Sequence, residues 1–295
     1  KQRYGSLDAL NKARWTDFWS HRFTAWSQVE SPAPHGENLV HGLVIDWKRF
    51  VSHQSLDFFR TESAPLRAIT PQIPVAVNMM GTYPGLNYWE WAPHVDIISW
   101  DNYPRWHNAE QSDADEASKI AFIHDINRSL KQGKPWLLME STPSQVNWQP
   151  VNRLKAPGMH RLSSLQAVAH GSDAVMYFQW RKGRGASEKF HGAVVDHVGH
   201  ENTRVFCDVA GLGAELAGLG AVAGSRLPAK AAVIYDWENR WAIDEFQGFN
   251  KPERDYERTC VEFHRALWKQ SIACDVAFLV LEVSQYKLGV APWRF

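Results

Sequence analysis

Four short apolar runs, each ending in polar residues or a chain breaker, constrain the fold of this chain more than any other feature. The runs are Pro74–Asn78, Val95–Pro104, Trp136–Glu140 and Ala174–Trp180. Such runs, bounded by breakers, are typical of buried strands. In a parallel sheet their polar ends meet at one edge, where α/β proteins bind ligands.

Helical patterns separate the last three runs. Ile120, Ile123, Ile126 and Leu130 share one face of a predicted helix over Glu116–Lys131, and Gly133 is suited to its C-terminal cap. A second helix is predicted over Met159–His170. Alternating strands and helices require a parallel sheet with right-handed crossovers. The pattern favours the top face of a (β/α) barrel, and a doubly wound sheet is the alternative.

The flanking regions carry weaker signals. Ser6 and Asp8 predict a capped helix start, and the aromatic residues that follow from Trp15 to Trp26 are expected to pack in a helix or an ordered loop. Val44–Ser63 is loosely helical, and Pro65 is expected to break or kink that helix.

A second α/β unit is predicted to start near residue 226. Its expected elements are a strand at 231–236, a helix at 254–270, and strands at 275–281 and 286–290. The glycine-rich run Gly218–Gly224 precedes this unit but follows a predicted helix, not a strand, so it does not indicate a dinucleotide site. The domains are therefore predicted at 1–225 and 226–295, both incomplete.

Composition excludes several classes of protein. The 32 Lys and Arg balance 32 Asp and Glu, so no nucleic acid or membrane partner is expected. No apolar run approaches the ~20 residues that span a bilayer. Cys207, Cys260 and Cys274 are too few and too dispersed for a disulfide framework or a Cys-rich zinc site, and they suit a reducing, cytoplasmic compartment. The 15 Trp could stack on sugar rings, but packing in a core explains them better.

Glu140 is the candidate for chemistry, because its carboxylate stands where a buried run stops. A glycosidase needs two carboxylates, and Asp101 and Glu188 also lie at or beyond strand ends. Tyr103 is placed to donate its hydroxyl to Glu140 and keep that carboxylate ionised, as a nucleophile requires. The alternatives are a surface charge at Glu140 and a turn aromatic at Tyr103.

Other residues form a possible ligand-binding set. Trp148 and Trp180 are expected at the same edge of the sheet as Glu140. Glu188 and His191 could bind one ligand, as hydrogen-bond acceptor and donor. Taken singly, such a glutamate is more often a surface charge and such a histidine a packed side chain. His197 and His200 do not have the spacing of a zinc peptidase helix. No metal ion or cofactor is expected, and neither a serine hydrolase elbow nor a phosphate-binding loop occurs.

Taken together, these segments resemble glycoside hydrolase family 42 β-galactosidases. The resemblance rests on Asn78–Gly81, Ile98–Pro104, Leu137–Glu140, Phe178–Arg181, Glu188–Gly192, Tyr4–Asn11 and Ile234–Asn239, in the family's order. It implies the second half of a TIM barrel followed by a flavodoxin-like trimerisation domain, and a homotrimeric parent protein that hydrolyses galactosides with retention. Glu140 takes the position of the nucleophile, and Tyr103, Trp148, Glu188 and His191 match galactose-binding positions.

The chain departs from the family pattern at one point. The family places its acid/base Glu directly after an Asn, and no Asn-Glu pair occurs in these 295 residues. The chain is therefore expected to be an internal fragment that is inactive alone. The alternatives are a remnant that at most binds carbohydrate and a related glycosidase acting on α-L-arabinopyranosides.

Overall fold

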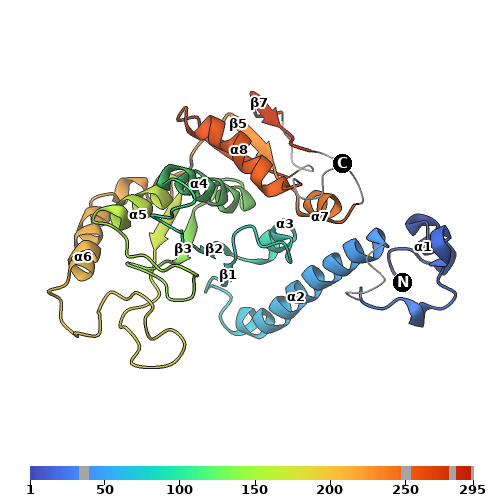
Figure 1. Ribbon diagram of the computed structural model, residues 1–295, viewed down its shortest axis with the longest axis horizontal. Helices are drawn as coiled ribbons and strands as arrows, with labels where there is room; N and C mark the ends of the chain where they lie inside the picture. Colours follow the sequence, from blue (N-terminus) through green and yellow to red (C-terminus); the bar gives the residue numbers. More distant parts are fainter. Residues whose placement is uncertain (33–39, 247–253, 279–283, 294–295) are drawn as a thin grey trace.

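A computed structural model describes residues 1–32, 40–246, 254–278 and 284–293. Two separate parallel sheets organise these residues (Figure 1). The first sheet lies within residues 76–175 and the second within 231–290. An arm that carries the N-terminal helices extends away from both sheets.

The first sheet contains four strands in sequence order. They are β1 (Ala76–Met79), β2 (Ile97–Asp101), β3 (Trp136–Glu140) and β4 (Ser172–Val175). Parallel strands in consecutive order are the arrangement of a (β/α) barrel, so the predicted fold class is confirmed. β4 begins two residues before the predicted run. It can start with the polar residue Ser172 because the Ser172 hydroxyl donates to the carbonyls of Trp136 and Ala174.

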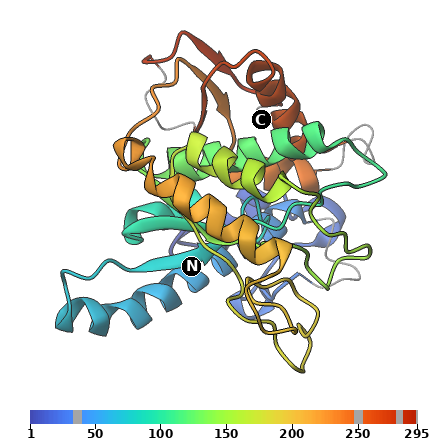
Figure 2. The ribbon, with the colours of Figure 1, turned by 90° about the vertical axis from the view of Figure 1, so that its left-hand side faces the viewer.

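Helices cover the outer face of this sheet. Ser112 caps α4 (Asp113–Leu130) by accepting from the Asp115 amide, and α4 packs beside α5 (Met159–Ala169). Thr203 caps α6 (Arg204–Ala217), which packs on α5 and ends before the glycine-rich run. Figure 2 shows the three helices side by side. Phe122, Ile126 and Trp136 are fully buried, and the Phe122 ring contacts Tyr235 and His264 of the second unit.

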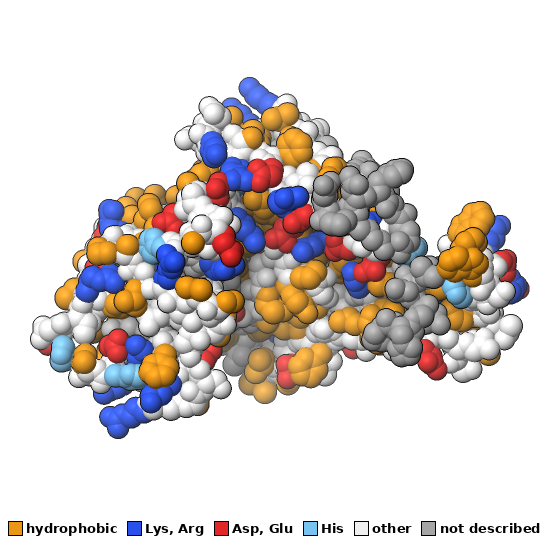
Figure 3. Space-filling model, in the orientation of Figure 1, with side chains coloured by type: hydrophobic (Ala, Val, Ile, Leu, Met, Phe, Trp, Pro, Cys, Tyr) orange, Lys and Arg blue, Asp and Glu red, His pale blue; other side chains and the backbone are white. Residues whose placement is uncertain are grey.

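The N-terminal arm confirms one expectation and corrects two. Ser6 caps α1 (Leu7–Arg14) as predicted. Pro65 does not break α2, which runs over His41–Ile69; the proline lies near the C-terminal end, and beyond it the Thr70 amide still bonds to the Leu66 carbonyl at 2.8 Å. Trp15, Phe18 and Trp19 do not pack into a core; all three are exposed. Figure 3 shows hydrophobic side chains gathered at the outer end of this arm.

Short elements complete the first unit. They are α3 (Tyr88–Trp91) and the 3-10 turns Phe18–Ser20, Trp26–Gln28, Ala92–His94 and Gly220–Val222.

The second sheet has the strand order β6-β5-β7, with all pairs parallel. The strands are β5 (Ala231–Ile234), β6 (Cys274–Ala277) and β7 (Leu288–Val290). Their order in space corresponds to the 2-1-3 start of a flavodoxin-like sheet. α8 (Tyr256–Trp268) matches the predicted helix, whereas α7 (Trp237–Glu245) was not predicted. Residues 279–281 of the predicted strand lie outside the described residues.

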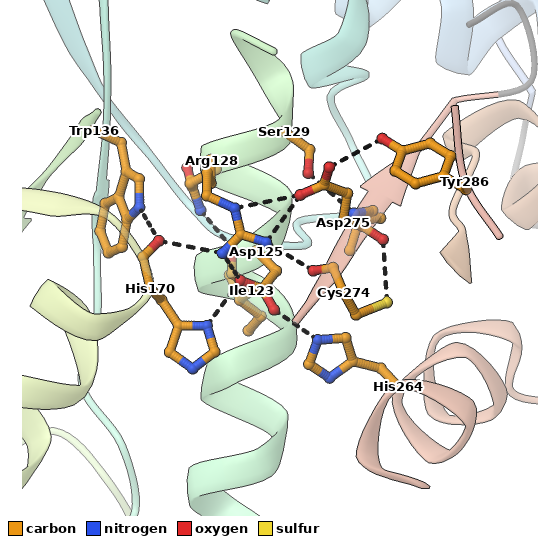
Figure 4. A network of polar contacts seen from close by, with 12 residues as sticks. Ile123, Asp125, Arg128, Ser129, Trp136, His170, His264, Cys274, Asp275 and Tyr286 are labelled. Carbon is orange, nitrogen blue, oxygen red and sulfur yellow. Dashed lines mark hydrogen bonds and ion pairs between the residues drawn. The ribbon is translucent and has the colours of Figure 1, made fainter. Parts of the chain in front are cut away.

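A buried ionic network joins the two units (Figure 4). Asp125 on α4 accepts from Nε2 of His264 on α8 at 2.8 Å and meets Nδ1 of His170 at 2.7 Å. Arg128 also contacts Asp125, and it reaches Asp275 on β6 at 2.9 Å. The second unit is therefore fixed to the helix that covers β2 and β3.

Three further observations concern the cysteines, membrane-spanning helices and metal-binding groups. The described cysteines are all free thiols, with Cys260 and Cys274 buried and Cys207 exposed. Within the described ranges, no helix has the length and apolar character to cross a bilayer. The same ranges contain no group of three or more His, Cys, Asp or Glu side chains arranged to hold a metal ion.

Candidate active site

Glu140, the last residue of β3, has a hydrogen-bond donor on each carboxylate oxygen. Tyr103 donates its hydroxyl to Oε2 at 2.6 Å, and Asn78 donates Nδ2 to Oε1 at 2.8 Å. Two donors on one half-buried carboxylate hold it in one orientation. The expected contact between Tyr103 and Glu140 is therefore present.

Sequence reasoning missed the role of Asn78. The available signal was its position as the polar last residue of the first apolar run, which places it at the same edge of the sheet as Glu140. The contact spans two strands, because β2 lies between β1 and β3. Only the assembled sheet brings the two side chains together.

Asp101 stands directly opposite Glu140. An irregularity in the pairing of β2 and β3 after Trp100 brings Asp101, rather than the next residue Asn102, into register with Glu140. The Asn102 amide then donates to the Glu140 carbonyl at 2.9 Å. Burial and, next, the charge of Glu140 raise the pKa of Asp101 to about 7. Two neighbouring carboxyls that differ in this way can play different parts in one reaction.

Aromatic rings surround Tyr103. Trp148 and His191 each meet the Tyr103 ring edge-on, with centroids 5.6 Å apart. Burial and the hydrogen bond to Glu140 raise the pKa of the Tyr103 hydroxyl, so it stays a donor throughout the physiological range. Trp148 is 54% exposed and presents its ring to solvent beside the carboxylate. Such a ring suits the apolar face of a sugar.

Two loops carry the remaining predicted residues. His191 is buried, with Nδ1 3.0 Å from the Gly192 carbonyl oxygen, whereas the Glu188 side chain is exposed. The His191 amide bonds to the Glu188 carbonyl at 3.0 Å, so the two residues occupy one turn. Asn147 ties this turn to the Trp148 loop by donating to the Ser187 carbonyl at 2.7 Å.

A buried lysine supports the Trp148 loop from beneath. Lys155 donates Nζ to the Thr142 carbonyl at 2.7 Å, and burial lowers the pKa of its amine to about 8. Gly192 lies against the other side of the loop, where an added Cβ would stand 2.5 Å from Thr142 Oγ1. The loop geometry around Glu140 therefore depends on close packing.

Other candidates lie apart from this cluster. Trp180 is 67% exposed and contacts Phe206 rather than Tyr103. His197 bonds to the Gly183 carbonyl through Nε2 at 2.7 Å, and His200 accepts from the Asn202 amide. Each of these two histidines thus forms a hydrogen bond with a backbone group of its own loop.

Comparison with known proteins places this geometry in a family. Residues 1–219 match glycoside hydrolase family 42, described as beta-galactosidase, and residues 229–294 match the beta-galactosidase trimerisation domain of the same family. The chain belongs to glycoside hydrolase family 42. The resemblance inferred from the sequence motifs is confirmed.

Relatives and solved structures agree with this assignment. The chain is 56% identical over its whole length to beta-galactosidase BglY of Alicyclobacillus acidocaldarius, and covers 43% of that protein. It is 51% identical to beta-galactosidase GanA of Bacillus subtilis, covering 45%. Among solved structures, Gan42B, a GH42 beta-galactosidase, superposes with a TM-score of 0.96 at 51% identity, over 99% of this chain and 43% of Gan42B. This family member thus spans less than half the length of the relatives it matches.

Proposed function

We propose that the protein to which this chain belongs hydrolyses terminal β-D-galactosides with retention of configuration, and that Glu140 is its nucleophile. The observation that carries the proposal is the pair of hydrogen bonds that hold Glu140 at the end of β3. Family 42 relatives named beta-galactosidase support the substrate class.

In the first step Glu140 attacks the anomeric carbon, and the bond from that carbon to the leaving oxygen breaks while an acid protonates the oxygen. Water then attacks the same carbon and gives a proton to the deprotonated acid, while the bond to Glu140 breaks and its electron pair returns to the carboxylate. Tyr103 and Asn78 hold the carboxylate in the orientation for attack and stabilise it when it is released.

The neighbouring residues are proposed to bind the galactose. Trp148 offers a half-exposed ring for the sugar's apolar face, and the Tyr103 ring packs edge-on against it. Glu188 is proposed to accept from a sugar hydroxyl, and His191 to donate to one. The acid/base Glu is proposed to come from sequence outside these 295 residues, since the chain contains no Asn-Glu pair.

Replacing Glu140 in the full-length protein tests the proposal. Glu140→Gln should reduce turnover of an aryl β-galactoside by at least about 10⁴-fold, because the nucleophile is lost. Glu215→Gln, which alters an exposed carboxylate paired with Arg161, should keep normal turnover. Proton NMR of the first-formed sugar should show β-galactose. An α product, or full activity of Glu140→Gln, would refute the assignment.

The 295 residues alone are proposed to be inactive on substrates that need acid assistance. Turnover of lactose by the isolated chain would contradict this. A competing possibility is a preference for α-L-arabinopyranosides, which lack only the C6 hydroxymethyl group. Ratios of kcat/KM for the two aryl glycosides, measured on the full-length protein, decide between them.

Assembly and location are further parts of the proposal. The match of residues 229–294 to a trimerisation domain supports a homotrimeric parent protein, with a boundary between the two units near residue 226. The free thiols agree with a reducing, cytoplasmic location. Light scattering of the full-length protein tests the trimer, and fractionation of the source cells tests the location.

A further inference from the structure

We infer that Asp101 is a positioning residue that carries a proton while Glu140 is ionised, and that loss of this proton slows the release of Glu140 from the sugar. The inference rests on the proposed function, because it assigns a second role within the same site. It concerns the second half of the reaction, in which the bond between galactose and Glu140 breaks.

The first support is the register of the strands. The pairing of β2 and β3 shifts after Trp100, and this shift sets Asp101 opposite Glu140. Without it, Asp101 would face Met139. Paired strands lie only about 4.8 Å apart, so the two carboxyl groups become close neighbours. Irregular pairing beside active sites commonly re-aims a side chain in this way.

The second support is the environment of the Asp101 carboxyl. Its Oδ1 is buried and accepts no hydrogen bond from any residue in the described part of the chain. Asn78 and Tyr103 donate to the neighbouring carboxylate of Glu140 instead. Within the described residues, donors therefore stabilise a negative charge on Glu140, and none stabilises one on Oδ1 of Asp101.

The titratable groups around Asp101 come from three elements. Glu140 faces it from β3, Tyr103 follows β2, and Tyr88 lies on α3, where burial raises the pKa of the phenol to about 12. In the described ranges, none of the groups that influence Asp101 is a cation. A proton on Asp101 is thus the available way to avoid two adjacent negative charges.

The proton has opposite effects on the two steps. Attack by Glu140 neutralises its charge, so an ionised Asp101 would favour formation of the covalent intermediate. Release restores the charge on Glu140, so an ionised Asp101 would oppose it. In the covalent intermediate Glu140 carries no charge, so only burial raises the pKa of Asp101 there. Deglycosylation should therefore slow as pH rises through a range below about 7, in which Asp101 of the intermediate loses its proton.

The experiment uses the full-length enzyme labelled with 2,4-dinitrophenyl 2-deoxy-2-fluoro-β-D-galactoside, which traps the intermediate without needing the acid. After excess reagent is removed, recovery of activity measures release. Between about pH 5 and pH 8.5 the wild-type rate should fall about tenfold, the change that one pKa unit of coupling produces. General-base assistance to water only rises or levels off with pH, so it cannot cause this fall.

Asp101→Asn should abolish the fall, because its amide has no proton to lose. Asp96→Asn, which alters a carboxyl at the opposite end of β2, should keep it. A wild-type rate that is constant to pH 8.5, or a fall that persists in Asp101→Asn, would overturn the inference. If the label is not on Glu140, the proposed function itself fails, and mass spectrometry of the labelled peptide reveals this independently.

An infrared measurement covers the case in which Asp101→Asn does not fold. The wild-type protein should show the C=O stretch of a protonated carboxyl that disappears as pH rises through about 7. Selective isotope labelling of aspartate carboxyls assigns the band. Absence of any aspartate band with this titration would also overturn the inference.

Discussion

At the scale of single residues, the two hydrogen bonds to Glu140 differ in their donors, one a hydroxyl and the other an amide. The Tyr103 hydroxyl approaches to 2.6 Å, within the range of charge-assisted O–H···O⁻ bonds, and the Asn78 amide lies at 2.8 Å. Tyr103 also packs between Trp148 and His191, so one side chain links the carboxylate to the sugar-facing rings.

Tyr103→Phe should therefore impair chemistry while keeping the fold. Hydrogen bonds to charged groups contribute about 1.5–3 kcal/mol, which corresponds to a loss of roughly 10- to 150-fold in kcat/KM. Steady-state kinetics of the full-length enzyme measure this. Tyr4→Phe is the matched control, because Tyr4 donates to Asp46 at 2.7 Å far from the site. A comparable loss in both variants would show that the effect is structural.

The sequence predicted Glu140 and Tyr103 because each follows a recognisable strand. It did not predict Asn78 as a partner, since that contact depends on the order of three strands in the sheet. It also did not distinguish His191, which is buried, from Glu188, which is exposed, although both lie in one turn. Burial of individual loop side chains depends on which other loop covers them.

At the scale of elements, the site depends on two loops that are docked on each other. Gly192 donates its amide to the Gln145 carbonyl at 2.7 Å, and a Cβ there would stand 2.7 Å from the same oxygen. No larger residue fits unless the Trp148 loop moves away from Glu140.

Gly192→Ala should raise KM and lower kcat/KM by at least about tenfold, and destabilise the fold by about 1–3 kcal/mol through overpacking. Kinetics and thermal unfolding of the full-length enzyme measure both effects. Gly185→Ala provides the control, since nothing lies within 4 Å of the added Cβ. Normal kinetics in Gly192→Ala would mean that the loop docking is dispensable.

The interface between the two units depends on Asp125. Burial raises the pKa of Asp125, but the charges of His170 and Arg128 and its hydrogen bonds outweigh this and hold the pKa well below its usual range. A depressed carboxyl pKa stabilises the fold above the unfolded value of about 3.9, and this stabilisation is lost as pH falls through the folded value.

Asp125→Asn should destabilise the protein by about 3–5 kcal/mol near neutral pH, because it leaves buried cations without their counter-charge. The difference from wild type should shrink in acid, below about pH 4. Denaturant unfolding across pH measures both, and Glu215→Gln, in an exposed pair, should behave like wild type. A difference independent of pH down to strong acid would exclude the ionic explanation.

Periodicity predicted most elements, and the misses have physical causes. β3 matched its predicted bounds because a continuous apolar run ends in a carboxylate. α7 was missed because Trp237 and Trp241 are buried, donating their indole N–H groups to the Tyr83 and Pro84 carbonyls, so its apolar residues did not resemble a solvent-facing amphipathic helix. Local pattern does not reveal such contacts between the two units.

At the scale of the whole molecule, the chain exposes more surface than its mass predicts. The accessible surface is 16535 Å² for 33.7 kDa, whereas a compact monomer of this mass exposes about 12,700 Å². The excess, roughly 3,800 Å², is the size of a large obligate interface. Exposed aromatics on the arm and the outer edge of β1 contribute to it.

The isolated 295 residues should therefore self-associate when expressed alone. Light scattering after gel filtration should detect species larger than 33.7 kDa, and unpaired strand edges supply the contact. Phe18→Lys, which replaces an exposed aromatic of the arm, should reduce association, whereas Val198→Lys, at an equally exposed position outside the arm, should not. A monodisperse monomer with a single cooperative melting transition would contradict this prediction.

The strand order of the first sheet has a consequence for protein engineering. Each strand pairs only with its neighbours in sequence, so the pairings that build this sheet all close within residues 76–175. A cut in the chain before β1 would leave all hydrogen-bonded strand pairs of this sheet in one piece. We therefore expect a full-length protein that is split before β1 to keep the pairing of this sheet intact, which makes that position a site at which complementation between separately expressed pieces can be tested.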